Sequence, residues 1–335
     1  MTTYLVVIVL TALAFDYING FHDAANSIAT VVSTRVLSPR AAVIWAAFFN
    51  FIAFKVYPMH VSAAITRGVA LSSVTYNVIF ATLLGAIAWN LLTWWWGLPS
   101  SSSHALMGAF AGAALTHTPN FAILDREVFG RTVLFIVLAP MIGMALGFLL
   151  MVLVRTILRN LRPSRVDRIF RRGQLLSAAL YSLGHGGNDA QKTMGIVTLL
   201  LVTARIQERT HHVTPQTWVV LACSAAMGLG TLSGGWRIVR TMGMKITKLK
   251  PVGGFCAETA GGITLALATF LKVPVSTTHT ITGSIMGVGS ADGRLNAVRW
   301  GVAGRIVWAW ILTIPAAGAT ASISYLTVRL LTGHP

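Results

Sequence analysis

The sequence predicts an all-α fold, a polytopic transmembrane bundle of about 10–12 helices with inverted-topology repeats and broken or re-entrant helices. Three observations lead to this fold class. The composition is too apolar for a soluble domain, long apolar runs recur along the whole chain, and two short polar motifs each occur twice in the same order.

The composition indicates a membrane protein. Of the 335 residues, 55% are hydrophobic and only 10% are charged, whereas a soluble domain usually carries about 25% charged residues. Apolar runs of roughly 20 residues, the length that spans a bilayer as a helix, recur throughout. The stretch from Tyr4 to Phe15 lacks the basic flank of a signal peptide, so we expect it to remain as the first span. The lipid bilayer is therefore the first predicted partner.

Ten apolar runs can be read as crossings, five in each half of the chain. They cover 3–34, 41–57, 69–96, 100–116 and 130–154, and then 174–204, 214–234, 252–272, 276–290 and 300–330. The runs at 3–34 and 174–204 contain glycine and polar residues, so we expect both to be interrupted. This reading gives transmembrane repeat 1 at 1–155, a basic cytoplasmic linker at 156–172 and inverted transmembrane repeat 2 at 173–335.

The basic residues indicate the orientation. The formal net charge is +17, and twelve of the basic residues lie in two short segments (Arg155, Arg159, Arg162, Arg165, Arg168, Arg171, Arg172; Arg237, Arg240, Lys245, Lys248, Lys250). Short basic loops between apolar spans mark the cytoplasmic side, which favours this explanation over a nucleic-acid surface. We therefore expect a multi-pass protein of the plasma (inner) membrane with both termini extracytoplasmic. Because each half would contain five spans, an odd number, the second half would enter the membrane from the opposite side, as an inverted repeat requires.

Two motifs are duplicated. Residues 99–108 read PSSSSHALMG and residues 274–283 read PVSTTHTITG, and each has a histidine five positions after proline and a glycine four positions later. Upstream, 19–26 read NGFHDAAN and 184–192 read GHGGNDAQK, each with a central aspartate. Two different motifs that recur in the same order at similar separation indicate an internal repeat.

The duplicated aspartates, Asp23 and Asp189, lie at predicted membrane depth, where a carboxylate costs on the order of 2.5–3.5 kcal/mol. Their duplication favours coordination of a driving cation or proton exchange over a buried polar link between helices. Asp16 and Glu258 are also placed in the membrane but lack this support, so both interpretations stay open for them. The residues predicted for cation coupling are Asp23, Asp189, Asn19, His22 and Glu258. No fixed metal site is expected, because Cys223 and Cys256 are isolated in apolar stretches.

The hydroxyl residues after each proline are suited to an oxyanion. Proline begins a helix without losing a needed donor, and the first backbone N–H groups of a helix attract anions. Hydroxyl groups there could hold a tetrahedral oxyanion; the alternative is ordinary N-capping. The residues predicted to bind the anion are Ser101, Ser102, Ser103, Ser276, Thr277, Thr278, Asn26, Asn188 and Gln191.

Three further residues are candidates for a relay or a gate. His104 and His279 occupy matched positions and could bind an oxyanion or transfer a proton near neutral pH, or could be packing residues. Lys192 follows Asp189 by three positions in an apolar run. We expect it to pair with Asp189, although contact with the anion and snorkelling towards the interface are alternatives.

Together these motifs resemble the PiT family of inorganic phosphate transporters. The resemblance is carried by NGFHDAANSIAT at 19–30, GHGGNDAQKTMGI at 184–196, the two Pro-Ser/Thr-His stretches and GFCAETAGG at 254–262, and it runs from about residue 15 to residue 290. It implies an inverted-repeat fold, secondary active transport and phosphate bound near the midplane. The family's acidic residues correspond to Asp23 and Asp189, its amides to Asn26 and Asn188, and its hydroxyls to Ser101–Ser103 and Ser276–Thr278.

The first motif departs from one branch of that family. Sodium-coupled animal members carry Asn-Asp in both repeats, whereas this sequence has His22-Asp23 in the first. This form is similar to the bacterial and plant branch, in which proton coupling or transport of metal-phosphate complexes is common, although some bacterial members use sodium and some carry sulfate.

The resulting expectation is a symporter that imports inorganic phosphate by alternating access, coupled to H+ or Na+, with no cofactor and no enzymatic activity. A sulfate or metal-phosphate transporter of the same fold is the first alternative. An intramembrane hydrolase using Ser, His and Asp is disfavoured, because one catalytic centre does not need two Ser/Thr-His stretches. A homo-oligomer and a monomer are both compatible with the sequence.

Overall fold

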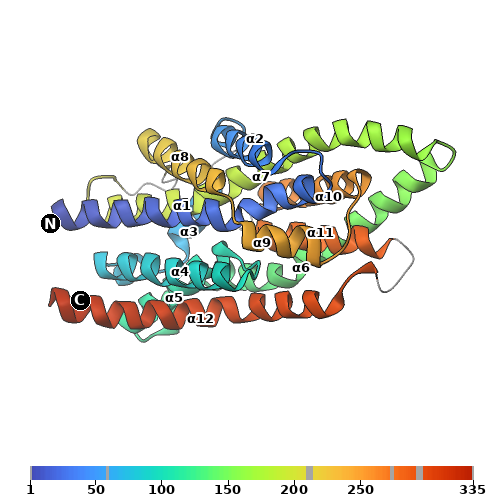
Figure 1. Ribbon diagram of the computed structural model, residues 1–335. Coiled ribbons are helices and arrows are strands. Elements are labelled where there is room, and N and C mark those ends of the chain that lie inside the picture. The colour runs from blue at the N-terminus through green and yellow to red at the C-terminus, as the bar shows by residue number, and fades with distance from the viewer. Residues whose placement is uncertain (1, 58–59, 209–213, 272–274, 292–296, 334–335) are drawn as a thin grey trace.

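The computed structural model describes residues 2–57, 60–208, 214–271, 275–291 and 297–333, which form twelve α-helices and no strand (Figure 1). The helices are α1 (Thr2–Ser33), α2 (Pro39–Ile52), α3 (His60–Arg67), α4 (Tyr76–Trp96), α5 (Ser102–His117), α6 (Arg126–Leu158), α7 (Pro163–Thr203), α8 (Thr217–Ser233), α9 (Trp236–Arg240), α10 (Pro251–Phe270), α11 (Thr277–Ser290) and α12 (Trp300–Thr332). The short segments are η1 (Ala53–Lys55), η2 (Leu71–Ser73), η3 (Phe121–Ile123) and the π-helical η4 (Thr241–Lys245).

The helices differ in whether they can cross a bilayer. Five described helices, α1, α4, α6, α10 and α12, are long and apolar enough to do so, and α8 with α9 and η4 would make a sixth, bent by 58°. By contrast, α5 has 16 residues and α11 has 14, so at 1.5 Å per residue they extend only about 24 and 21 Å. Because the hydrocarbon core is about 30 Å thick, α5 and α11 reach only part of the way. The predicted all-helical polytopic bundle is confirmed.

The predicted interruptions of 3–34 and 174–204 are wrong, because α1 and α7 run continuously through both motifs. Their glycines serve close helix contact instead. A Cβ at Gly20 would lie 2.2 Å from the Met227 carbonyl oxygen, and one at Gly186 would lie 2.4 Å from that of Asn50. A glycine inside a helix costs only about 1 kcal/mol, whereas each unpaired backbone group in a bilayer costs several. Continuity is therefore favoured.

The bent helix lies elsewhere, between α8 and α9. Gly234 has a φ of 65°, and a Cβ at Gly235 would lie 2.5 Å from the Phe21 carbonyl oxygen. Glycine is needed at both places, once for a left-handed backbone and once for close approach. The segment 237–250, expected as a basic loop, is accordingly largely helical, as α9 and η4.

The basic linker predicted at 156–172 is also mostly helical. α6 continues to Leu158 and α7 begins at Pro163, so only 159–162 form a turn. With 41 residues, α7 extends about 60 Å, and the α6–α7 hairpin projects at the end of the bundle opposite the two termini (Figure 1). The Arg171 guanidinium donates to the Arg35 carbonyl at 2.9 Å, so two basic segments far apart in the chain meet at this end.

The two short helices pack against partners from the other half of the chain. α5 lies against α12, and α11 lies against α6. A Cβ at Gly108 of α5 would lie 2.4 Å from the Ile314 carbonyl oxygen, and one at Gly283 of α11 would lie 2.2 Å from that of Pro140. The next glycine on each helix repeats the relation (Gly112 with Gly318, Gly287 with Met144). Matched motif positions thus make matched contacts.

The apolar core consists of two clusters with a polar layer between them. On α1, Ile8 and Phe15 belong to one cluster, and Ile28 and Val31 belong to the other. The α1 residues between these positions include the buried polar side chains Asp16, Asn19, His22 and Asp23. α7 likewise contributes to both clusters. The core therefore leaves a polar layer at mid-bundle, where the predicted site residues lie.

Candidate functional site

The two duplicated carboxylates meet in this polar layer. Asp23 on α1 and Asp189 on α7 are 2% and 1% exposed, and one ligand atom from each, with one from His185, all lie within 4.8 Å of one another. His185 is one helical turn before Asp189, and its Nε2 lies 3.2 Å from Asp189 Oδ2. Two carboxylates and an imidazole at this separation could hold a cation. The site therefore joins the two halves of the chain.

Asp23 is held by neighbours from both halves. His22 Nδ1 lies 2.7 Å from Asp23 Oδ1, and His22 Nε2 lies 3.0 Å from the Thr93 hydroxyl at the end of α4. Across the site, the Thr278 hydroxyl donates to Asp23 Oδ1 at 3.4 Å. The carboxylate thus links α1 to the start of α11.

Asp189 has a cationic partner on its own helix. The Lys192 ammonium, one turn along α7, pairs with Asp189 Oδ1, as the spacing predicted. It also contacts the Ser103 hydroxyl and lies 3.5 Å from the Val275 carbonyl oxygen. The Thr277 hydroxyl donates to the other carboxylate oxygen at 2.9 Å. A buried lysine is tolerated here because the carboxylate neutralises it.

The starts of α5 and α11 meet at the charged group formed by Asp23, Asp189 and Lys192. Ser101 accepts from the His104 N–H at 3.2 Å, and Ser276 accepts from the His279 N–H at 3.2 Å. For these two residues the N-capping alternative is therefore the observed contact. The following hydroxyls of Ser103, Thr277 and Thr278 reach the charged residues instead. The first N–H groups of a helix have no intrahelical acceptor. The starts of α5 and α11 therefore bring two sets of backbone donors to one buried place.

The Ser102 hydroxyl is buried without a hydrogen-bond partner in the described part of the chain. Pro274, which opens the second motif, lies outside the described residues.

The paired histidines are in contact. The His104 and His279 rings lie 4.7 Å apart at an interplanar angle of 75°, and His279 stacks on Trp310 of α12 at 4.0 Å. Neither ring nitrogen of His104 has a hydrogen-bond partner among the residues described. The contact connects the starts of α5 and α11 to the long helix α12.

The three predicted amides are not equivalent. Asn26 Nδ2 lies 2.9 Å from the Thr278 hydroxyl and 3.3 Å from that of Thr277, inside the site. Asn188 donates instead to Thr269 of α10 at 3.1 Å, and Gln191 accepts from the Val61 N–H of α3 at 3.0 Å. The structure therefore brings Asn26 to the aspartates and directs Asn188 and Gln191 to neighbouring helices.

The other two residues predicted for cation coupling, Asn19 and Glu258, lie outside the group around Asp23 and Asp189. Asn19 is a neighbour of Asp16, together with Thr193 and Cys223. Glu258 on α10 accepts from Gln174 Nε2 at 3.0 Å and from the Ser177 hydroxyl. Glu258 thus belongs to a second buried polar group between α7 and α10.

His185 is the main site residue that the sequence reasoning missed. It lies inside the GHGGND motif, four positions before Asp189, and that spacing on a helix places both side chains on one face. The signal was therefore available. Thr93, by contrast, reaches His22 from a helix 71 positions later in the chain, and no local pattern marks it.

Comparison with known proteins identifies the family of this chain. The model of a family described as "Phosphate transporter family" matches residues 19–321. A probable low-affinity inorganic phosphate transporter of Rhizobium meliloti (strain 1021) is 54% identical over 98% of this chain and 97% of its own. One of Bacillus subtilis (strain 168) is 45% identical over 97% of each chain.

The fold has a solved counterpart. A structure described as "The sodium-dependent phosphate transporter" superposes with a TM-score of 0.87 over 98% of this chain and 99% of the other, at 24% identity. That similarity establishes the fold, and the family model with the close relatives establishes the membership. This chain belongs to the phosphate transporter family.

Proposed function

We propose that this protein is a symporter that imports inorganic phosphate by alternating access, driven by a cation that binds with Asp23 and Asp189. The observation that carries the proposal is the convergence of two helix starts and two carboxylates in one buried group. An anion site and a cation site that share residues couple the two ions, because each favours the other's binding.

The phosphate would lie between the starts of α5 and α11. The donors there are the backbone N–H groups of the first turns and the hydroxyls of Ser103, Thr277 and Thr278. The Lys192 ammonium contacts Ser103 and is a further N–H donor at this place. Asp23 or Asp189 could accept a hydrogen bond from the P–OH group that phosphate retains near neutral pH, which favours phosphate over fully ionised sulfate.

The cation would bind Asp23, His185 and Asp189. Two carboxylates carry two negative charges, and Lys192 already neutralises one of them. One monovalent cation therefore balances the pair. The structural neighbour described as sodium-dependent supports a cation-coupled mechanism, and both H+ and Na+ fit a site made of carboxylates and imidazole.

The packing of the bundle supports an inverted repeat. Gly108 and Gly283 make corresponding contacts, as do Ser101 and Ser276, which supports two repeats at 1–155 and 173–335. Basic segments gather at the end opposite the termini. By the positive-inside rule this end would be cytoplasmic, with both termini extracytoplasmic in the plasma (inner) membrane.

The hydrolase alternative gains no support from the site. A catalytic serine needs a base with a free lone pair within hydrogen-bond reach, whereas the group that contacts the Ser103 hydroxyl is the Lys192 ammonium, which is ion-paired with Asp189. The His104 ring nitrogens have no partner in the described part of the chain. We therefore propose transport without enzymatic chemistry or a cofactor.

The test is uptake of labelled phosphate into proteoliposomes of the purified chain under an imposed sodium gradient or an imposed pH gradient. We expect accumulation with one gradient and none without either, and excess sulfate should compete weakly. Equal uptake with and without any cation gradient would contradict symport. Stronger competition by sulfate than by unlabelled phosphate would instead reassign the anion.

A further inference from the structure

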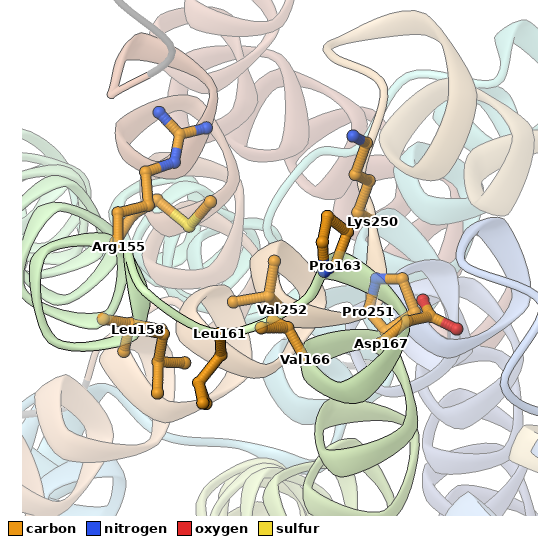
Figure 2. Close-up of a pocket in the computed structure, with 11 residues that line it drawn as sticks. Arg155, Leu158, Leu161, Pro163, Val166, Asp167, Lys250, Pro251 and Val252 are labelled. Atoms are coloured by element: carbon orange, nitrogen blue, oxygen red, sulfur yellow. The ribbon is translucent and has the colours of Figure 1, made fainter.

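A pocket at the basic end of the bundle lies apart from the central site. It has a volume of about 570 Å³ and is formed where the α6–α7 hairpin meets the start of α10 (Figure 2). Arg155 and Lys250 stand on opposite sides of it, and Leu158, Leu161 and Val252 lie between and below them (Figure 2). The pocket therefore combines a charged rim with an apolar floor.

The rim is strongly positive. Arg155 donates to the Ala291 carbonyl at 2.7 Å, which holds its side chain at the edge of the pocket. Lys248 and Lys250 line an adjoining hollow together with Arg155. The carboxylate in the lining, Asp167, pairs with Arg171 of its own helix at 2.9 Å. An anionic group would be attracted to this rim.

Two helix starts add to the attraction. α7 begins at Pro163 and α10 at Pro251, both prolines line the pocket, and neither helix has a side-chain cap. The first N–H groups of each helix then have no intrahelical acceptor. They add partial positive charge that favours an anion. The lysine and arginine side chains are a second, independent source of the same preference.

The apolar floor of the pocket indicates the kind of molecule to which the anionic group belongs. Val154, Leu158, Leu161, Val166 and Val252 present half-buried apolar side chains to the pocket. A free inorganic anion makes no use of such a surface, whereas the acyl chains of a lipid pack against it through van der Waals contact. Basic pockets between membrane helices bind the head groups of anionic lipids. We propose that this pocket binds one anionic phospholipid, with its phosphate on Arg155, Lys248 and Lys250.

Native mass spectrometry of the full chain in mild detergent tests this proposal. Phosphatidylglycerol and phosphatidylcholine would be titrated separately, because they differ in net charge. We expect preferential retention of phosphatidylglycerol by the wild type and a loss of about tenfold or more in R155Q/K250Q, since each basic residue near an anionic lipid contributes measurably. The matched control is R168Q/R172Q, which removes equal charge from exposed residues of α7 that do not line the pocket.

A second variant and a second ligand make the result decisive. Leu161→Trp fills the apolar floor without changing charge and should weaken phosphatidylglycerol binding while leaving the protein folded. Equal loss in the pocket pair and the control pair would overturn the proposal, as would wild-type binding without preference for phosphatidylglycerol. Displacement of the lipid by millimolar inorganic phosphate, with no effect of Leu161→Trp, would also overturn it in favour of a free-anion site. The assay reads binding alone, so it is independent of transport.

Discussion

Asn26 and Lys192 each follow a duplicated aspartate by three residues, yet they serve the site differently. The Asn26 amide extends across the site to Thr277 and Thr278, whereas the Lys192 ammonium pairs with Asp189 of its own helix. One half of the chain therefore carries a built-in cation at a position where the other half carries a neutral amide. We expect this difference to determine how many cations accompany phosphate.

Lys192→Asn makes the second half resemble the first. Without the ammonium, the two carboxylates would need one further cation for charge balance, so the Hill coefficient of uptake for the driving cation should rise by about one. Uptake by proteoliposomes at varied cation concentration measures it. Lys192→Arg, which keeps the charge, is the control. An unchanged coefficient in Lys192→Asn would show that Lys192 does not substitute for an ion.

Asp23→Asn should reduce phosphate uptake to the level of empty vesicles, because it removes the carboxylate that faces both His22 and Thr278. Asp189→Asn should do the same and also destabilise the protein by about 3–5 kcal/mol, since it leaves the buried Lys192 without its partner. Thermal unfolding of the purified variants separates the two effects. Glu127→Gln, which removes an exposed carboxylate paired with Arg131 at the start of α6, should leave uptake normal. Wild-type uptake by both site variants would remove Asp23 and Asp189 from the coupling mechanism.

Gly283→Ala should destabilise the protein, because the added Cβ would meet the Pro140 carbonyl oxygen at 2.2 Å. Overpacking of this kind typically costs about 1–3 kcal/mol. Gly262→Ala provides the comparison, since nothing lies within 4 Å of its added Cβ and replacing a helical glycine by alanine is favourable by about 0.5–1 kcal/mol. The thermal midpoints of the two variants should therefore move in opposite directions. A stabilised Gly283→Ala would mean that α11 does not pack on α6 as described.

His279→Ala tests whether the paired histidines are packing residues. It removes two ring contacts, with His104 and with Trp310, each of which contributes about 0.5–1.5 kcal/mol. His279→Phe restores the rings without an ionisable group, so it should recover both stability and uptake. Recovery of stability without uptake would instead assign His279 a role in proton transfer or anion binding.

The parts of the site that follow local rules could be predicted from the sequence. Proline followed by hydroxyl residues specifies a helix start, and duplication of the aspartate motif indicated that Asp23 and Asp189 meet. The spacing of the polar residues on α7 could also have predicted which of them share the face that lines the site, but this was not predicted. His185, Asp189 and Lys192 are spaced to share one helix face, whereas Asn188 and Gln191 lie on the neighbouring side and contact α10 and α3.

Continuity of α1 and α7 could not be predicted in the same way. Glycine permits both a helix break and a close helix contact, and the choice depends on which helix lies opposite. Gly20 meets α8 and Gly186 meets α2, and neither partner can be identified from the motif itself. Gly234, whose neighbour is also glycine, was the position where the backbone turns.

The packing of α5 and of α11 on long helices from the other half of the chain limits how the two halves can move. Because α5 is seated on α12 and α11 on α6 through glycine contacts that leave no room for a side chain, the first half cannot withdraw from the second as a separate block. We therefore expect α5 to move with α12 and α11 to move with α6. Each such pair combines helices from both halves of the polypeptide, and the hydroxyl residues at the starts of α5 and α11 would move with the long helix that supports them.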